Sequence, residues 1–292
     1  MTEKRSPDAG AAATLDDLPP LRTVIAEYGL GARRSLGQHF LLDLNITRRI
    51  ARAAGDLTAA TVIEVGPGPG GLTRALLERD VKRLYAVEAD RRCVDALSAL
   101  TDAARGRLEV IADDATRIDI ATLGAPPRHI VANLPYNVAT VLLIKWLRTA
   151  ASFAGMTLMF QKEVAERIVA GPGSKTYGRL SVMANWLCET RLCFNLPARA
   201  FTPPPKVASS VVHLEPYEKT TSAEEWSAME TVTAAAFGQR RKMLRSALRP
   251  LDVDTATLLS RAGVDPAARA ERLTVAEFAT LVQTFTDLRA DP

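Results

Sequence analysis

The sequence predicts an α/β protein with a doubly wound, mostly parallel β-sheet, followed by a small all-helical C-terminal domain. Three observations support this fold class. Between residues 61 and 160, short apolar runs rich in β-branched residues alternate with helical patterns, which is typical of parallel strands joined by crossover helices. The first run leads directly into the glycine-rich turn GPGPGG at 66–71. From about Glu218 onward the apolar spacing is helical throughout.

The predicted parallel strands end in residues suited to ligand binding. The second, third and fourth strands run directly into Glu88, into Asp113 and Asp114, and into Asn133. Because the carboxyl ends of parallel strands share one edge, where open α/β sheets bind ligands, we expect a site there. The five strands are expected at 61–65, 84–87, 108–112, 129–132 and 156–160.

The remaining patterns divide the chain into three parts. We expect a disordered leader at 1–20, the sheet domain at 21–216 and the helical domain at 217–292. An antiparallel pair at 193–196 and 209–214 would close the sheet. The helices of the sheet domain are expected at 21–28, 45–54, 72–79, 91–100, 141–147 and 162–169. Those of the C-terminal domain are expected at 223–237, 238–248, 254–262 and 274–288.

Composition narrows the class of protein. The chain has 292 residues, with 37 Lys and Arg against 33 Asp and Glu, a mildly basic balance that is compatible with RNA. Its three cysteines form no CxxC pair and its three histidines are scattered, so we expect neither a disulfide framework nor a metal site. We predict a cytoplasmic protein without a membrane span, and a monomer.

The glycine-rich turn predicts a site for a nucleotide-like ligand. A strand, a glycine turn and a helix N-terminus bring the backbone close to such a ligand, and Glu88 at the next strand end can accept hydrogen bonds from two ribose hydroxyls. Gly66, Gly68 and Gly71 also fit the dinucleotide pattern GxGxxG, and a purely structural turn is a further alternative. Asp114 favours S-adenosylmethionine, because a carboxylate there can bind an adenine amino group. A pyrophosphate would need donors that are not evident.

The tetrapeptide Asn133-Leu134-Pro135-Tyr136 predicts that the reaction takes place at an adenine amino nitrogen. An adenine amino nitrogen is a poor nucleophile, and two acceptors, the Asn133 side-chain oxygen and the Leu134 carbonyl, can orient its N–H bonds. Pro135 stiffens the turn and Tyr136 can stack on the base. The alternative is a Pro-containing turn with an asparagine cap and a core tyrosine.

Together with these motifs, the chain from about Gly29 to Phe285 resembles the bacterial small-subunit branch of the rRNA adenine N6,N6-dimethyltransferase family. The matching stretches include SLGQHFLLD, VIEVGPGPGGLT, YAVEAD, ANLPYN, FTPPPKVASSVV, FGQRRKMLRSAL and GVDPAARAERLTVAEF. The resemblance implies a Rossmann-like class I S-adenosylmethionine-dependent methyltransferase. It also implies dimethylation of two adjacent adenines near the 3′ end of 16S rRNA in the pre-mature small ribosomal subunit, and hence a role in ribosome biogenesis.

The resemblance also implies roles for individual residues. Asn133 would bridge the cofactor and the target amine, and Phe201 would stack on the flipped base opposite Tyr136. The family often has asparagine where this chain has His39, and phenylalanine where it has Leu36. The residues implied to bind the cofactor are His39, Leu41, Gly66, Glu88, Asp114 and Asn133.

A basic segment predicts the RNA-binding surface. On a helix at 238–248, Arg241, Arg245 and Arg249 would share one face and contact successive phosphates, with Lys242 beside them. The alternative is an ordinary solvated helix face.

Three other functions remain open on the sequence. The first is a methyltransferase of large-subunit rRNA, the second a non-catalytic RNA-binding assembly factor, and the third a dinucleotide oxidoreductase. The tetrapeptide and the VDPAARAE segment at 264–271 favour the small-subunit enzyme.

Overall fold

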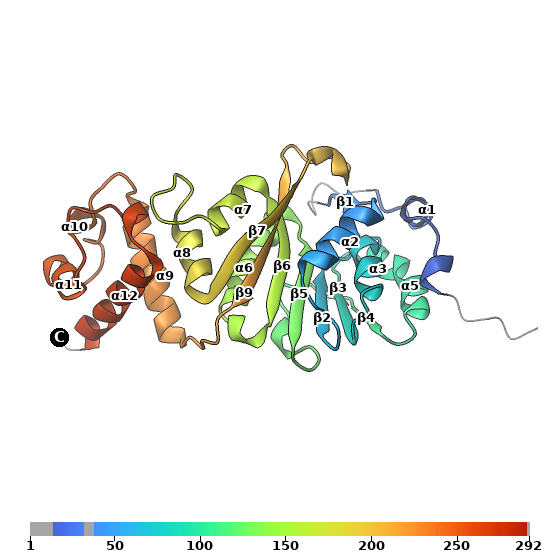
Figure 1. Cartoon of the computed structure of the whole chain (residues 1–292), viewed down its shortest axis with the longest axis horizontal. Coiled ribbons are helices and arrows are strands. Elements are labelled where there is room, and N and C mark those ends of the chain that lie inside the picture. The colour runs from blue at the N-terminus through green and yellow to red at the C-terminus, as the bar shows by residue number, and fades with distance from the viewer. Residues whose placement is uncertain (1–13, 32–37, 291–292) are drawn as a thin grey trace, which may run out of the picture.

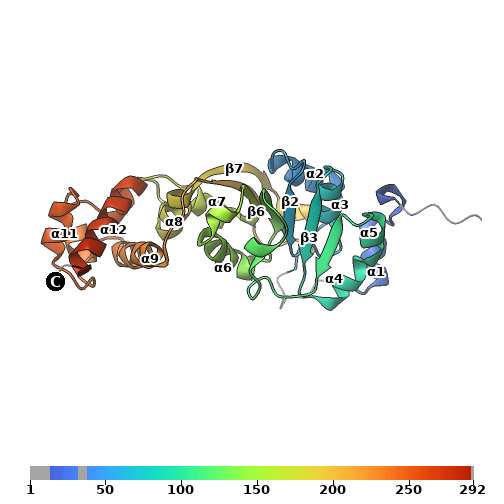
Figure 2. The same ribbon diagram turned by 90° about the horizontal axis from the view of Figure 1, so that it is seen from below.

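The computed structural model describes residues 14–31 and 38–290. The molecule is elongated, with the sheet domain at one end and the C-terminal helices at the other (Figures 1 and 2). Residues 1–13 of the predicted leader lie outside the described residues. The described part of that leader holds a short 3₁₀ helix, Leu15–Asp17.

A seven-stranded sheet forms the centre of the larger domain. Its strand order is β4-β3-β2-β5-β6-β9-β7. The first five strands in this order pair in parallel, and β9 and β7 add an antiparallel edge, as predicted for the closing pair. The strands are β2 (Thr61–Val65), β3 (Arg83–Val87), β4 (Leu108–Ile111), β5 (Arg128–Asn133), β6 (Gly155–Gln161), β7 (Cys188–Leu196) and β9 (Ser209–Pro216).

Successive strand residues point to opposite faces and enter two different cores. In β5, Ile130 and Ala132 join the core on one face while Val131 joins the core on the other. Both faces are covered by helices, which explains why the parallel strands are nearly continuous apolar runs. The helices of this domain are α1 (Leu21–Glu27), α2 (Leu44–Ala53), α3 (Gly71–Leu77), α4 (Arg91–Ala96), α5 (Ser98–Ala103), α6 (Tyr136–Leu147), α7 (Lys162–Ile168) and α8 (Arg179–Leu187).

A separate two-stranded ribbon lies near the glycine turn. Strand β1 (Phe40–Leu41) pairs antiparallel with β8 (Phe201–Thr202), so that residue 41 is opposite residue 201. The ribbon brings together two distant sequence segments, QHFLLD at 38–43 and FTPPPKV at 201–207. Only the family resemblance, and no local pattern, predicts that these segments lie near the active site.

The C-terminal helices follow the prediction except at one place. They are α9 (Ala223–Gly238), α10 (Leu244–Ala247), α11 (Thr255–Arg261) and α12 (Val275–Ala290). The predicted helix 238–248 is wrong, because α9 ends at Gly238 and only four residues form α10. The backbone N–H of Leu244 donates to Ala268 O (2.8 Å) and that of Arg245 to Pro266 O (3.2 Å). These tertiary bonds, and the burial of Leu244, replace a continuous helix.

Two further differences concern segments of the sheet domain. Helix α8 was not predicted, and the expected helix 91–100 is divided into α4 and α5. Strand β7 starts at Cys188, five residues before the predicted strand, because it pairs along most of β9 rather than at its end alone. Within the described residues, no helix combines the length and apolar character needed to cross a bilayer.

Candidate active site at the carboxyl edge of the sheet

The glycine turn forms the floor of a pocket beyond the end of β2. Gly66, Gly68 and Gly70 have φ values of +72°, +55° and +87°, a left-handed backbone that glycine adopts without strain. A Cβ on Gly71 would lie 2.8 Å from the backbone oxygen of Leu41, so only glycine lets the turn pack against β1. The glycines therefore determine the shape of the turn that lines the pocket.

Glu88 joins the glycine turn to the end of β3. Its carboxylate oxygens accept hydrogen bonds from the backbone N–H groups of Gly68 (3.1 Å) and Asp90 (2.9 Å). The residue is only 8% exposed, and burial raises its pKa above the usual value. Because each carboxylate oxygen can accept a second bond, Glu88 retains the capacity to bind a pair of hydroxyl groups.

Asp114 begins the loop that follows β4. Its Oδ1 accepts hydrogen bonds from the backbone N–H and the hydroxyl of Thr116, both at 2.8 Å. These bonds, the backbone bond first, hold the pKa of Asp114 below its usual value. Among the described residues its Oδ2 accepts no hydrogen bond, so this oxygen is available on the pocket lining.

Glu64 is a pocket residue that sequence reasoning missed. It lies in β2, is 1% exposed, and neither of its carboxylate oxygens has a hydrogen-bond partner among the described residues. Thr73 lies close enough to affect its titration, but its hydroxyl is also unpaired. Burial raises the pKa of Glu64 to about 8. The signal in the sequence was a single charged residue inside the apolar strand TVIEV.

The tetrapeptide that begins at the end of β5 presents two hydrogen-bond acceptors, one from a side chain and one from the backbone. Asn133 is the last residue of β5, and its Nδ2 donates to the backbone oxygen of His39 at 3.3 Å. That bond orients the amide so that Oδ1 is left without a donor among the described residues. The Leu134 carbonyl likewise accepts no hydrogen bond from them, and Pro135 precedes the first turn of α6.

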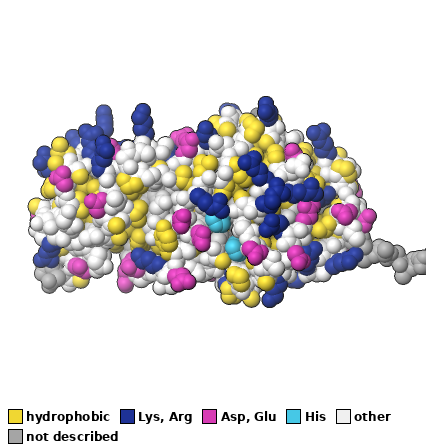
Figure 3. Space-filling view, viewed as in Figure 1, with side chains coloured by type: hydrophobic (Ala, Val, Ile, Leu, Met, Phe, Trp, Pro, Cys, Tyr) yellow, Lys and Arg dark blue, Asp and Glu magenta, His cyan; other side chains and the backbone are white. Residues whose placement is uncertain are grey.

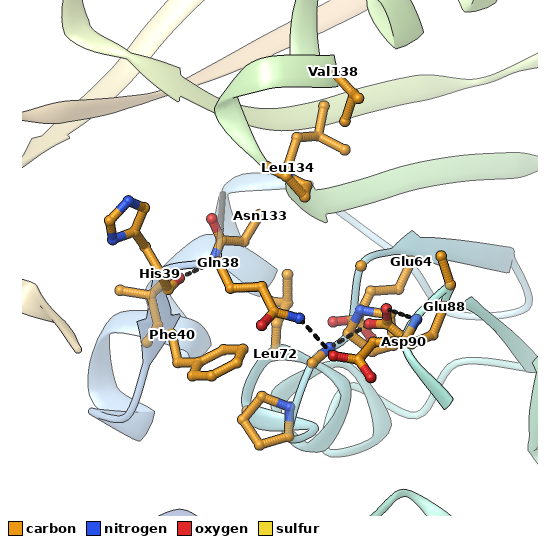
Figure 4. Close-up of a pocket in the computed structure, with 18 of the residues that line it drawn as sticks. Gln38, His39, Phe40, Glu64, Leu72, Glu88, Asp90, Asn133, Leu134 and Val138 are labelled. Carbon is orange, nitrogen blue, oxygen red and sulfur yellow. Dashed lines mark hydrogen bonds between the residues drawn. The ribbon is translucent and has the colours of Figure 1, made fainter. Parts of the chain in front are cut away.

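His39 and Tyr136 stand side by side at the mouth of the pocket. Their rings are stacked, with centroids 5.5 Å apart and planes inclined by 29°. The His39 Nδ1 lies 2.8 Å from the backbone oxygen of Pro203, and the Tyr136 hydroxyl lies 2.6 Å from Ser209 Oγ. Figure 4 shows the imidazole turned away from Glu64, Glu88 and Asp90. His39 therefore connects the tetrapeptide to the turn after β8.

The structure brings most of the predicted site residues into one pocket of about 300 Å³. Four carboxylic acids line it, and the described lining residues include no Lys or Arg. Such a lining fits a cationic ligand with hydroxyl and amino donors and is unsuited to a pyrophosphate. The predicted residues on the lining are His39, Leu41, Gly66, Glu88, Asp114, Asn133, Leu134 and Tyr136.

Phe201 does not lie where the resemblance implied. Its side chain is 3% exposed and packs in the core with Leu41, its partner across the β1–β8 ribbon. It is absent from the described lining of the pocket, so in this structure it is not placed to stack on a base. The aromatic ring beside Tyr136 is that of His39.

The predicted RNA-binding residues lie far from the pocket, at the C-terminal end of the molecule. Arg241, Lys242 and Arg245 are exposed, and Arg241 and Lys242 lie in the turn between α9 and α10. Arg241, Arg245 and Arg249 do not share one helix face as predicted, because the predicted helix is interrupted and only Arg245 lies in α10. Figure 3 shows Lys and Arg side chains gathered along the upper edge of this end and over α2.

In the described ranges, no group of three or more His, Cys, Asp or Glu side chains is arranged to hold a metal ion.

Comparisons with known proteins are consistent with this geometry. Residues 29–287 match the family described as ribosomal RNA adenine dimethylase. The chain is 57% identical to ribosomal RNA small subunit methyltransferase A of Xanthobacter autotrophicus, over 95% of this chain and 98% of the relative. It is 56% identical to the protein of the same name from Rhodospirillum rubrum, over 94% and 96%.

Two solved structures extend the comparison to the fold. A dimethyladenosine transferase from Plasmodium falciparum is 26% identical with a TM-score of 0.74, covering 86% of this chain and 98% of its own. The 23S rRNA methyltransferase ErmE is 24% identical with a TM-score of 0.63, covering 85% and 99%, and shows a shared fold.

Proposed function

The chain belongs to the ribosomal RNA adenine dimethylase family, and from this premise we propose that it dimethylates two adjacent adenines near the 3′ end of 16S rRNA. It is an S-adenosylmethionine-dependent rRNA adenine dimethyltransferase, and relatives more than 50% identical are named small subunit methyltransferase A. The observation that carries the proposal is the acidic pocket that ends at two unpaired acceptors, the Asn133 Oδ1 and the Leu134 carbonyl.

The residues present fit S-adenosylmethionine. When bound, this cofactor supplies an electrophilic methyl group on a sulfonium. Glu88 would accept hydrogen bonds from the ribose hydroxyls and the free oxygen of Asp114 would accept one from the adenine amino group. Glu64 is buried and has no hydrogen-bond partner among the described residues, so it matches a cationic ammonium better than any neutral group. Gly66, Leu41 and the backbone of His39 would contact the rest of the ligand.

Asn133 and Leu134 would prepare the target nitrogen. The two acceptors hold the two N–H bonds of an adenine amino group, which orients its lone pair toward the methyl donor and favours a pyramidal nitrogen. Tyr136 would support the face of the extruded base, with its ring fixed by Ser209 and His39. Positioning of this kind requires no strong general base at the nitrogen.

RNA outside the pocket would be held at the C-terminal end. Arg241, Lys242 and Arg245 are exposed and are proposed to contact phosphates of the rRNA. We further propose that the substrate is the pre-mature small subunit, that the protein acts in the cytoplasm as a monomer without a metal, and that residues 21–216 and 217–292 are its two domains.

The test is methylation of purified ribosomal subunits from cells that lack the enzyme. We expect methyl transfer to small subunits and none to large subunits, with mass spectrometry locating the product at two adjacent adenines of 16S rRNA. Methylation of the large subunit would instead identify a large-subunit enzyme, and absence of transfer to either would favour an assembly factor.

Asn133→Ala isolates the chemical step. We expect it to lower the turnover of small subunits at least 100-fold while S-adenosylhomocysteine binding measured by calorimetry changes less than threefold, because Asn133 is proposed to act mainly on the target amine. Tyr28→Phe, a change outside the pocket, is the control. Turnover near that of the unmodified enzyme would refute the assignment.

A further inference from the structure

Lys145 is held by one loop of the backbone rather than by a carboxylate. It lies on α6, and its Nζ donates to the carbonyl oxygens of Ala115 (3.2 Å), Thr116 (2.8 Å) and Ile118 (2.6 Å). Three acceptors use all three N–H donors of an ammonium group. Among the described residues, Lys145 forms no ion pair.

The loop that Lys145 holds is the one that begins with Asp114. Within it, the N–H groups of Arg117 and Ile118 donate to the Asp114 carbonyl at 2.8 and 3.4 Å, and Thr116 donates twice to Asp114 Oδ1. The loop is thus one compact turn around Asp114. The three carbonyls that face Lys145 accept no other hydrogen bond from the described residues, so without Lys145 they would lose their only protein partner.

The helix that carries Lys145 begins at the last residue of the tetrapeptide. Helix α6 begins at Tyr136, directly after Asn133, Leu134 and Pro135. We propose that Lys145 is a positioning residue, which ties the turn around Asp114 to α6 and so fixes the adenine end of the cofactor relative to Asn133. This inference rests on the proposed function, in which Asp114 binds the adenine amino group.

The geometry distinguishes lysine from other residues at this position. A compact ammonium can direct three donors to three carbonyls that surround it, whereas the planar guanidinium of arginine directs its donors within one plane. Lys145→Met replaces the side chain by an unbranched apolar one that is a single atom shorter, and it removes all three donors. Lys145→Arg keeps the charge, but its donors can satisfy only some of the three carbonyl oxygens. Lys82→Met, at an exposed lysine before β3, makes the same change of charge elsewhere.

The test is calorimetric binding of two ligands, S-adenosylhomocysteine and its analogue without the 6-amino group. We expect Lys145→Met to weaken S-adenosylhomocysteine binding about tenfold. It should leave binding of the analogue unchanged, because the analogue makes no bond to Asp114. Lys145→Arg should give an intermediate loss, and Lys82→Met none. In the double variant with Asp114→Ala, the Lys145 change should add nothing further to the loss.

Two results would overturn the proposal: unchanged S-adenosylhomocysteine binding by Lys145→Met, or equal weakening of both ligands, which would indicate a general structural role. If Asp114→Ala alone bound S-adenosylhomocysteine normally, the proposed role of Asp114 would fail first, and the inference with it. Lys145→Arg and its double variant with Asp114→Ala carry the same comparison if Lys145→Met does not fold.

Discussion

At the scale of single residues, Glu64 is a carboxyl group whose negative charge is destabilised by its surroundings. Its environment is a buried strand, and the neighbouring carboxylate of Glu88 further raises its pKa. A bound ammonium group would offset both effects. With a pKa of about 8, Glu64 is mostly protonated at neutral pH in the free protein. Binding of a cation should therefore release a proton.

This predicts a cofactor affinity that rises with pH. Between pH 6.5 and 8.5, S-adenosylhomocysteine should bind roughly 20-fold more tightly as Glu64 ionises. Calorimetry in buffers of different ionisation enthalpy should detect the released proton near pH 7. Glu64→Gln should abolish most of this pH dependence and bind more weakly at pH 8.5. An equally steep dependence in Glu64→Gln would show that another group titrates.

His213 predicts a second pH effect, on stability. It lies in β9, is 8% exposed, and its Nδ1 lies 2.8 Å from the Thr157 hydroxyl. Burial lowers its pKa from 6.5 to about 4. Because the unfolded chain then binds a proton that the folded protein excludes, stability is present above pH 6.5 and is lost as the pH falls toward 4.

The loss should be about 2 kcal/mol in the free energy of unfolding between pH 7.5 and 5. Urea unfolding at a series of pH values measures it, and His213→Asn separates it from the contribution of other groups. The variant should show a shallower pH dependence. If its curve runs parallel to that of the unmodified protein, His213 does not contribute as proposed.

At the scale of elements, the order of strands and helices followed from the local pattern, but the extent of each element did not. The segment 238–248 has the composition of a helix, yet its N–H groups at 244 and 245 bond to residues 268 and 266 instead. Helix α8 was not predicted, because the residues after the GPGS turn show no clear helical spacing of apolar side chains. Tertiary contacts override weak local preferences of this kind.

Because the predicted helix is interrupted, Arg241 and Lys242 would contact RNA phosphates from an exposed turn and not from a helix face. Arg241→Glu with Lys242→Glu should weaken binding of small ribosomal subunits and reduce the slope of log affinity against log salt concentration by about 2, because two phosphate contacts are lost. Cofactor affinity should be unchanged, since both residues lie outside the pocket. Filter binding at several salt concentrations measures the slope.

The matched control reverses two exposed arginines elsewhere in the C-terminal domain, Arg261 in α11 and Arg289 in α12. It makes the same change of net charge. An equal loss of affinity in the control would mean that the effect is one of overall charge and not of the turn between α9 and α10.

At the scale of the whole molecule, one of the hydrophobic clusters on the sheet continues into the C-terminal helices. A single cluster of buried side chains extends from Ile63 in β2 to Phe285 in α12. Trp186 of α8 packs on Trp226 of α9 with ring centroids 6.4 Å apart, and Arg148 and Arg179 both pair with Glu230. The C-terminal helices are thus packed on the sheet domain as part of the same structure (Figure 1).

A shared core predicts cooperative unfolding. Scanning calorimetry of the full chain should show one transition, although the expected domains at 21–216 and 217–292 would suggest two. Trp226→Ala should lower stability by about 3–5 kcal/mol, since it removes a buried side chain at the centre of this contact. Tyr217→Ala, at an exposed residue, is the control. Two resolved transitions in the unmodified protein would contradict the shared core.

The sequence by itself determined the fold class, and it predicted which edge of the sheet carries the site and six residues of the pocket lining, whereas His39 and Leu41 were expected there only from the family resemblance. It could do so because these features depend on local chemistry: glycines that permit a left-handed turn, and polar residues where strands end. Only the tertiary structure decided the surroundings of each side chain. In the folded chain Phe201 is buried and His39 stacks beside Tyr136. Glu64 has no hydrogen-bond partner among the described residues, and Lys145 bonds to the loop of Asp114. Those relations depend on which distant segments meet when the chain packs, and no local pattern specifies them.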